Sequence, residues 1–418
     1  MTTTSMPSLM DSNSNSNSNS NTSFADDARS WAAFMDDRAW RSVCAFAKKC
    51  ARGKAMLGEC RGTRDARAGG RAREFERERT DARACENSSD ATSIRIRARV
   101  WYYGPSHAAF AWSREDVARL ASGDDALASV ESTIRRDFES VIALSSAIAI
   151  AGRTDRGAHA LANVCSFRVR EGMGVEDVER VARASAEARR GAARLTEISR
   201  VPHSFHATFS ATYRRYVYIV PRAQLRREAH APRMEIDVAK ANRMLASLTT
   251  ASANDGIDVY AFARATPKGK SCVVRFVVAS AFASTLPASR EDDGDDDDDD
   301  DDGDDDGAVV DANRRSRASA ARERTMRASA VDSPNASDES ASLDVIVFEL
   351  IADRFLRKLV RCLVSTTCRE AARSADDDVL VRMAHSRDRR LPAPPAPPVG
   401  LFFAGVSYSD DFECSREA

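Results

Sequence analysis

Residues 145–169, "SSAIAIAGRTDRGAHALANVCSFRV", contain two strand-like runs joined by a short polar turn. Between the runs, Arg153, Asp155, Arg156 and Gly157 fall within five positions. An aspartate that bonds local backbone and a glycine with positive φ are ordinary turn chemistry, so the spacing alone predicts a β-hairpin. The two arginines leave a second interpretation open. Neighbouring guanidinium groups favour an ionised carboxylate, which covalent or general-base chemistry requires.

The sequence on both sides of this hairpin predicts alternating strands and helices. Residues 94–100 alternate apolar side chains with arginines, which is typical of a half-exposed strand. Together with several hairpin-like neighbours, this interleaving indicates an α+β fold with mainly antiparallel sheets flanked by helices. Further strands are predicted at 210–220, 271–282, 342–352 and 399–408, and helices at 126–140, 174–190, 236–248 and 357–372.

The composition narrows the class of protein. Apolar residues make up 43% of the 418 residues, and 62 basic residues oppose 63 acidic ones. Because residues 291–306 are almost entirely aspartate, the rest of the chain is basic and suits a polyanionic partner such as nucleic acid. The nine cysteines are scattered without a CxxC pair, which favours reduced thiols in an intracellular protein over a zinc or disulfide framework. The apolar runs are too short for a membrane span, and none resembles a signal peptide.

Low-complexity segments divide the chain. We expect a disordered or targeting tail over residues 1–91, within which the spacing of apolar residues between 25 and 56 allows a short amphipathic helix. We expect a disordered insertion, first acidic and then basic, over 287–340. The folded part is expected in two portions, 92–222 and 223–286 with 341–411. The compartment stays open between nucleus, cytoplasm, mitochondrion and plastid.

Six blocks, in order, resemble the tRNA pseudouridine synthase A family. "AGRTDRGAHA" is similar to its GRTDxGVHA signature, which contains the family's catalytic aspartate. The other five are "YYGPSHAAFAW", "SFHATFSATYRRYVYIV", "DVYAFARA" with "VVR", "ADRFLRKLVRCLV" and "APPVGLFFAGVSY". They resemble YDGxxYxGW, FHARFSAxxRxYxYxI, DFxSFR…R, GxxFLxxMVRxxVG and APxxGLxLxxVxY.

The resemblance implies a fold, an activity and a set of site residues. The fold would have two similar halves with the active cleft between them, and the activity would be isomerisation of uridine to pseudouridine in the anticodon stem-loop of tRNA. A homodimer is expected, with no cofactor, metal or membrane. Position by position, Asp155 matches the catalytic aspartate, Arg153 the arginine that helps to open the stem, Tyr216 the tyrosine that stacks on the target uracil, Arg361 the basic partner of the aspartate, and Leu401 an apolar residue near the base pocket.

Several positions depart from the family pattern. Ala158 replaces the usual valine, Thr208 replaces the arginine of FHAR, and Ala261 replaces the serine of DFxSFR. None of these departures falls on Asp155 or Tyr216, so they bear on which RNA is bound and how it is placed more than on catalysis. Two alternatives remain: a catalytically silent RNA-binding protein on the same scaffold, and an interaction protein organised by the acidic run. The presence of Asp155, Tyr216 and Arg361 favours the enzyme.

Overall fold

The computed structural model describes residues 24–57, 94–111, 128–188, 193–222, 235–264, 271–286, 342–373 and 375–409. The predicted insertion at 287–340 lies outside these residues. Within them, no helix is both long and apolar enough to cross a bilayer. The helices are α1 (Phe24–Asp36), α2 (Trp40–Arg52), α5 (Val130–Asp137), α6 (Val175–Ala188), α7 (Val238–Ala251), α9 (Leu359–Ala372) and α10 (Val379–Ser386), with 3₁₀ turns η2 (Gly104–Ser106) and η3 (Pro398–Gly400).

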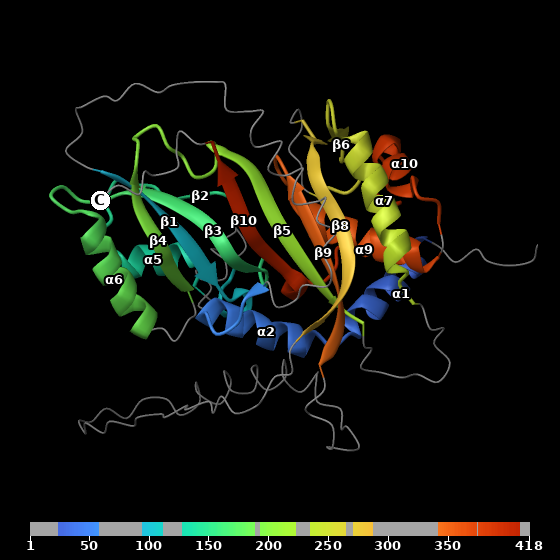
Figure 1. Ribbon diagram of the computed structural model, residues 1–418, viewed down its shortest axis with the longest axis horizontal. Coiled ribbons are helices and arrows are strands. Elements are labelled where there is room, and N and C mark those ends of the chain that lie inside the picture. Colours follow the sequence, from blue (N-terminus) through green and yellow to red (C-terminus); the bar gives the residue numbers. More distant parts are fainter. Residues whose placement is uncertain are drawn as a thin grey trace, which may run out of the picture.

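One mixed sheet of eight strands forms the centre of the molecule (Figure 1). Its order is β4-β1-β3-β10-β5-β9-β8, and β2 pairs with β3 outside this path. All pairings are antiparallel except that of β10 with β3. The strands are β1 (Arg95–Tyr102), β2 (Ala149–Ile150), β3 (His159–Arg168), β4 (Ala193–Val201), β5 (Ala211–Pro221), β8 (Phe276–Leu286), β9 (Leu343–Ala352) and β10 (Leu401–Tyr408), and β6 (Ile257–Asp258) with β7 (Val273–Val274) forms a second, small sheet. This arrangement confirms the predicted α+β class.

The sheet runs through the boundary predicted at residue 222. β5 precedes that boundary in sequence, yet it pairs with β9 on one side and β10 on the other. Strand β10 lies in the middle of the sheet and connects β5 with β3, because it also pairs in parallel with the start of β3, at His159 and Ala160. The site hairpin and the C-terminal strand are therefore neighbours.

Local sequence explains where several elements begin. β1 alternates between half-buried and buried residues along its whole length, as its arginine-apolar pattern predicts. α5 begins after Ser129, whose hydroxyl accepts a hydrogen bond from the Ser132 amide. α7 begins after Asp237, whose carboxylate accepts from the Lys240 amide. Such caps satisfy amides that have no partner within the helix.

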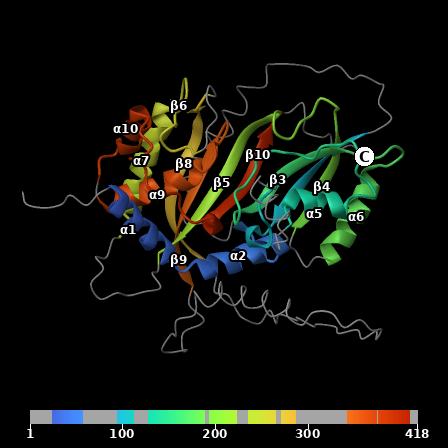
Figure 2. The same cartoon turned by 180° about the vertical axis from the view of Figure 1, so that it is seen from behind.

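Different helices pack against the two faces of the sheet. α6 packs beside β4, α7 beside β8, and α9 beside β5 and α7 (Figures 1 and 2). Side chains alternate between the faces along a strand, so Tyr216 and Tyr218 point to one face while Val217 and Ile219 point to the other. The tyrosines belong to the larger core with residues of α9, and the aliphatic pair belongs to a smaller core with residues of α2.

Residues 24–57 belong to the segment for which we expected a disordered or targeting tail, and they form two helices where the sequence allowed one short amphipathic helix. α1 packs against α9, where the indole of Trp31 donates to Ser365 Oγ at 2.8 Å. α2 instead covers the second face of the sheet with Val43 and Phe46, among others, and contacts β3, β5, β8 and η3. Apolar side chains at helical spacing were visible in the sequence, but the strands that they cover come far later in the chain.

Candidate active site

The hairpin between β2 and β3 presents Asp155 at its tip. The Ala158 amide donates to the Asp155 carbonyl at 3.1 Å, which closes a four-residue turn. Gly157 occupies the third position of this turn with φ +82°, a conformation that favours glycine. The Asp155 side chain is 23% exposed, so it is sheltered from solvent and still accessible.

Arg361 is the described ionic partner of Asp155. Its Nη1 lies 2.7 Å from Asp155 Oδ2, and its own side chain is 12% exposed. The same guanidinium donates from Nε to the Ala396 carbonyl at 2.6 Å, and the Ala396 amide donates back to the Arg361 carbonyl at 3.1 Å. Arg361 lies in the first turn of α9, so it connects three parts of the chain that are distant in sequence: the hairpin, α9 and the segment before β10.

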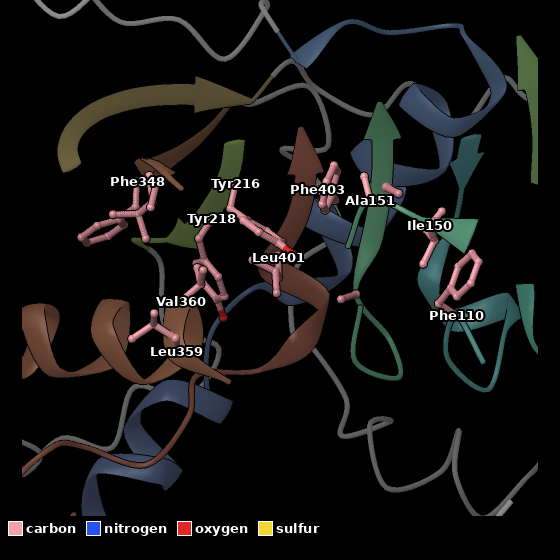
Figure 3. Close-up of a cluster of buried hydrophobic side chains, with 14 of the residues drawn as sticks. Phe110, Ile150, Ala151, Tyr216, Tyr218, Phe348, Leu359, Val360, Leu401 and Phe403 are labelled. Atoms are coloured by element: carbon pink, nitrogen blue, oxygen red, sulfur yellow. The ribbon is translucent and has the colours of Figure 1, made fainter. Parts of the chain in front are cut away.

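Aromatic and aliphatic side chains form a wall beside this ion pair. Tyr216 of β5 and Phe403 of β10 occupy paired positions, and their rings meet edge to face at 5.0 Å. Phe355 contacts the Tyr216 ring in the same manner at 4.7 Å. Leu401 is buried and pairs with Tyr218, so it belongs to the same wall (Figure 3). Burial raises the pKa of Tyr216, which keeps its phenol neutral.

The hairpin approaches this wall closely at Gly152. A Cβ atom at this position would lie 2.5 Å from the Phe403 ring and 3.2 Å from Tyr216 Oη. A real side chain could not fit without moving one of the rings. The glycine of the motif therefore allows the backbone next to Asp155 to contact the aromatic wall.

His159 fixes the other strand of the hairpin. Its Nδ1 accepts from the Gly104 amide at 3.1 Å, so the ring proton lies on Nε2, which donates to the Val399 carbonyl at 3.0 Å. The imidazole is also stacked between Tyr103 and Phe402. Burial lowers the pKa of His159 to about 4, so the ring is neutral near pH 7. This residue therefore has a structural role.

Arg214 is a positioning residue that the sequence reasoning missed. Its guanidinium donates to four backbone carbonyls: Asp353 at 2.7 Å, Thr208 at 2.5 Å, Ala211 at 3.1 Å and Ala151 at 3.3 Å. It therefore ties the first residue of the hairpin loop to the ends of β5 and β9. The signal was available, because Arg214 occupies the arginine position of the FSAxxRxYxY block.

The predicted site residues divide into two groups. Asp155, Tyr216, Arg361 and Leu401 surround one region, with Asp155 and Arg361 in direct contact. Arg153 is exposed on the hairpin, as is Arg156. The cation that contacts the carboxylate therefore comes from α9 and not from the turn.

Comparisons with known proteins point to the same family as the six sequence blocks. The family model described as tRNA pseudouridine synthase matches residues 304–409, which include Arg361 and Leu401. A tRNA pseudouridine synthase A from Chlorobium phaeobacteroides is 28% identical over 152 residues, 36% of this chain and 54% of the relative. The enzyme of the same name from Streptomyces griseus is 28% identical over 127 residues, 30% of this chain and 42% of the relative. The chain thus spans about half the length of the curated relatives that it matches. The six ordered blocks and these matches show that the chain is similar to the tRNA pseudouridine synthase A family, at low sequence identity.

Proposed function

We propose that this protein isomerises uridine to pseudouridine in tRNA, at a site in the anticodon stem-loop, with Asp155 as the catalytic carboxylate. The observation that carries the proposal is the Asp155–Arg361 pair, held at 2.7 Å beside a buried aromatic wall. The family match and the two relatives support the reaction type.

The reaction breaks one bond to the ribose and makes another. The bond between C1′ and uracil N1 is cleaved, the uracil turns, and C1′ joins C5. The proton on C5 is lost and N1 gains one, so the atoms balance without an oxidant or reductant. A sheltered carboxylate can act on the ribose or on the uracil, and the hydrogen bond from Arg361 orients it. Tyr216 offers the detached base an aromatic partner in the pocket.

Base flipping is part of this proposal. A uridine must leave its stack before C1′ is reachable, which costs a few kcal/mol. Stacking against an aromatic side chain such as Tyr216 returns roughly 1–3 kcal/mol. Arg153, which is exposed on the hairpin, would occupy the space that the base leaves. A homodimer, expected from the family resemblance, would extend the RNA-binding surface.

The decisive experiment replaces Asp155 with the isosteric amide. Asp155→Asn keeps a hydrogen-bond acceptor for Arg361 but removes the charge, so isomerisation should fall to a trace while tRNA affinity stays near that of the wild type. Tritium release from tRNA labelled at uridine C5 measures the reaction, and filter binding measures affinity. Asp388→Asn changes a half-buried carboxylate that pairs with Arg390 and serves as the matched control.

Two outcomes would overturn the proposal. Full turnover by Asp155→Asn would remove the catalytic assignment. Wild-type protein that binds tRNA without releasing tritium would be the catalytically silent RNA-binding protein.

A further inference from the structure

Phe209 is unusually exposed for a large aromatic residue. Its side chain is 83% exposed, a value shared by Leu144 and by no other large apolar residue in the described part of the chain. Singly exposed apolar residues are common, so exposure alone carries no function. The Phe209 ring, however, stacks on the imidazole of His206, with centroids 4.4 Å apart and planes 29° from parallel. One face of the ring is thus supported, and most of the remainder is open to solvent.

The turn that presents Phe209 is held by several hydrogen bonds. The Ser210 amide donates to the His206 carbonyl at 2.9 Å, and the His206 amide donates to Ser210 Oγ at 3.0 Å. His206 Nδ1 accepts from the amides of Thr208 and Phe209, at 3.2 and 3.4 Å. Burial, and next the charge of Arg95, lower the pKa of His206 and so preserve this acceptor. The exposed ring is therefore preorganised, which reduces the entropy lost on binding.

The same turn is anchored to the hairpin that carries Asp155. The Thr208 hydroxyl donates to the Ile150 carbonyl at 2.6 Å. Arg214 bridges the two segments, because it donates to the carbonyls of Thr208 and Ala151. Five residues of fully extended chain from Ile150 to Asp155 span at most about 18 Å. A nucleic acid with one nucleotide at Asp155 thus has neighbouring nucleotides within reach of Phe209.

The charges around Phe209 indicate what would cover it. Arg95 lies close enough to His206 to affect its titration, and Arg168 likewise affects Arg95. Arg153 and Arg156 are exposed on the adjacent hairpin. Cations beside an open aromatic face favour a polyanion with flat apolar groups over another protein surface. Unstacked RNA bases meet this description, since they stack on phenylalanine and histidine while arginines contact the phosphates.

We propose that Phe209 is a stacking platform for an unpaired base of the RNA, next to the nucleotide held at Asp155. The inference rests on the proposed function and adds to it a second point of contact with the RNA outside the pocket. Because stacking needs a π-face but no particular hydrogen-bond pattern, the contact would tolerate different bases.

The test compares Phe209→Ala, Phe209→Leu and Phe209→Trp with Leu144→Ala. Leu144 is equally exposed and has no aromatic ring, so Leu144→Ala controls for the loss of an exposed apolar side chain that has no π-face. We expect Kd for unmodified tRNA to rise about 5- to 140-fold for Phe209→Ala, the range that corresponds to the loss of one base stack. Phe209→Leu should lose nearly as much, Phe209→Trp should bind at least as tightly as wild type, and Leu144→Ala should be unchanged. Single-turnover rates at saturating tRNA should change much less than Kd.

Two results would overturn the inference: equal tRNA affinity for all four variants, or affinity that follows side-chain size regardless of aromaticity. A second copy of the protein could cover the Phe209 ring instead of RNA, and sedimentation of the free protein tests this. A shift of Phe209→Ala to smaller species, with unchanged tRNA affinity, would assign the ring to a contact between protein copies. Binding is measured separately from isomerisation. A protein that binds tRNA through Phe209 but makes no pseudouridine would therefore refute the proposed function alone.

Discussion

The buried His159 makes stability depend on pH in a calculable direction. The pKa of His159 is lowered to about 4 in the folded protein, against an ordinary value of 6.5. Below pH 6.5 the unfolded chain binds a proton at this site that the folded protein does not. The free energy of unfolding must therefore fall as the pH decreases from 6.5 to about 4, and then level off.

The size of the effect follows from the shift. Each pKa unit corresponds to 1.36 kcal/mol, so the full contribution is about 3 kcal/mol. Between pH 7 and pH 5 the same relation gives a loss of about 2 kcal/mol. Protonation of Nδ1 would also remove the acceptor of the Gly104 amide. Acid should thus loosen the contact between the hairpin and η2, which contains Gly104, as the protein approaches unfolding.

Urea unfolding at several pH values, followed by circular dichroism, tests this reasoning. His159→Phe preserves an aromatic ring between Tyr103 and Phe402 and removes the titrating group. It should be less stable than wild type at pH 7, because Gly104 and Val399 lose their partner, but its stability should fall about 2 kcal/mol less between pH 7 and pH 5. His203→Gln, a change at an exposed histidine, should follow the wild type. Equal pH dependence in wild type and His159→Phe would refute the reasoning, as would an NMR titration showing His159 protonated at pH 5.5.

Three further predictions concern the site and the acidic insertion. Tyr216→Phe should retain most of the isomerisation activity, whereas Tyr216→Ala should lose the roughly 1–3 kcal/mol that stacking on the base contributes. The single-turnover rate measures this loss, and a thermal melt first shows that each variant is folded. Arg361→Met removes a charged hydrogen bond worth about 1.5–3 kcal/mol, so we expect the single-turnover rate to fall roughly 10- to 150-fold while the tRNA affinity stays nearly unchanged. An unchanged rate would show that Arg361 has no role in the reaction. Leu286 pairs with Leu343, so a short turn can replace residues 288–340. If the acidic run competes with RNA, this deletion should tighten tRNA binding at low salt and give the wild-type affinity at high salt. Identical affinities of the deletion variant and the wild type at every salt concentration would exclude that competition.

Much of the sheet could be predicted because its strands carry a local pattern. The alternation of arginine with apolar residues locates β1, and the run of residues 342–352 locates β9 within one residue. β4 was not predicted, because it is an edge strand with several half-exposed positions and a residue of positive φ, Glu197, that interrupts the alternation. The predicted strand at 145–152 is reduced to the two residues of β2, since the chain leaves the sheet at the hairpin loop.

The candidate site was predictable only where motif positions exist. Asp155, Tyr216 and Arg361 come from three separate blocks, and their meeting depends on pairings that no local pattern reveals, such as that of β5 with β10. The two turn arginines suggested a local partner for Asp155, but residues so close in sequence need not point toward each other, and both are exposed. The motif position marks Arg214 as a residue to examine, but the backbone groups that Arg214 and His159 contact leave no signature in residue types.

The covered second face of the sheet also has a consequence for how the protein is made. α1 and α2 leave the ribosome first, yet Trp31 bonds Ser365, which lies 334 residues later. At about 5–20 residues per second, roughly 20 s to a minute of synthesis separates the helices from the surface they cover. During that time Val43 and Phe46 can contact β3 but still lack β9 and β10, whose Val347 and Phe402 belong to the same apolar cluster. Docking of the N-terminal helices is therefore completed late, and the newly made chain must be kept from aggregating until β10 has joined the sheet.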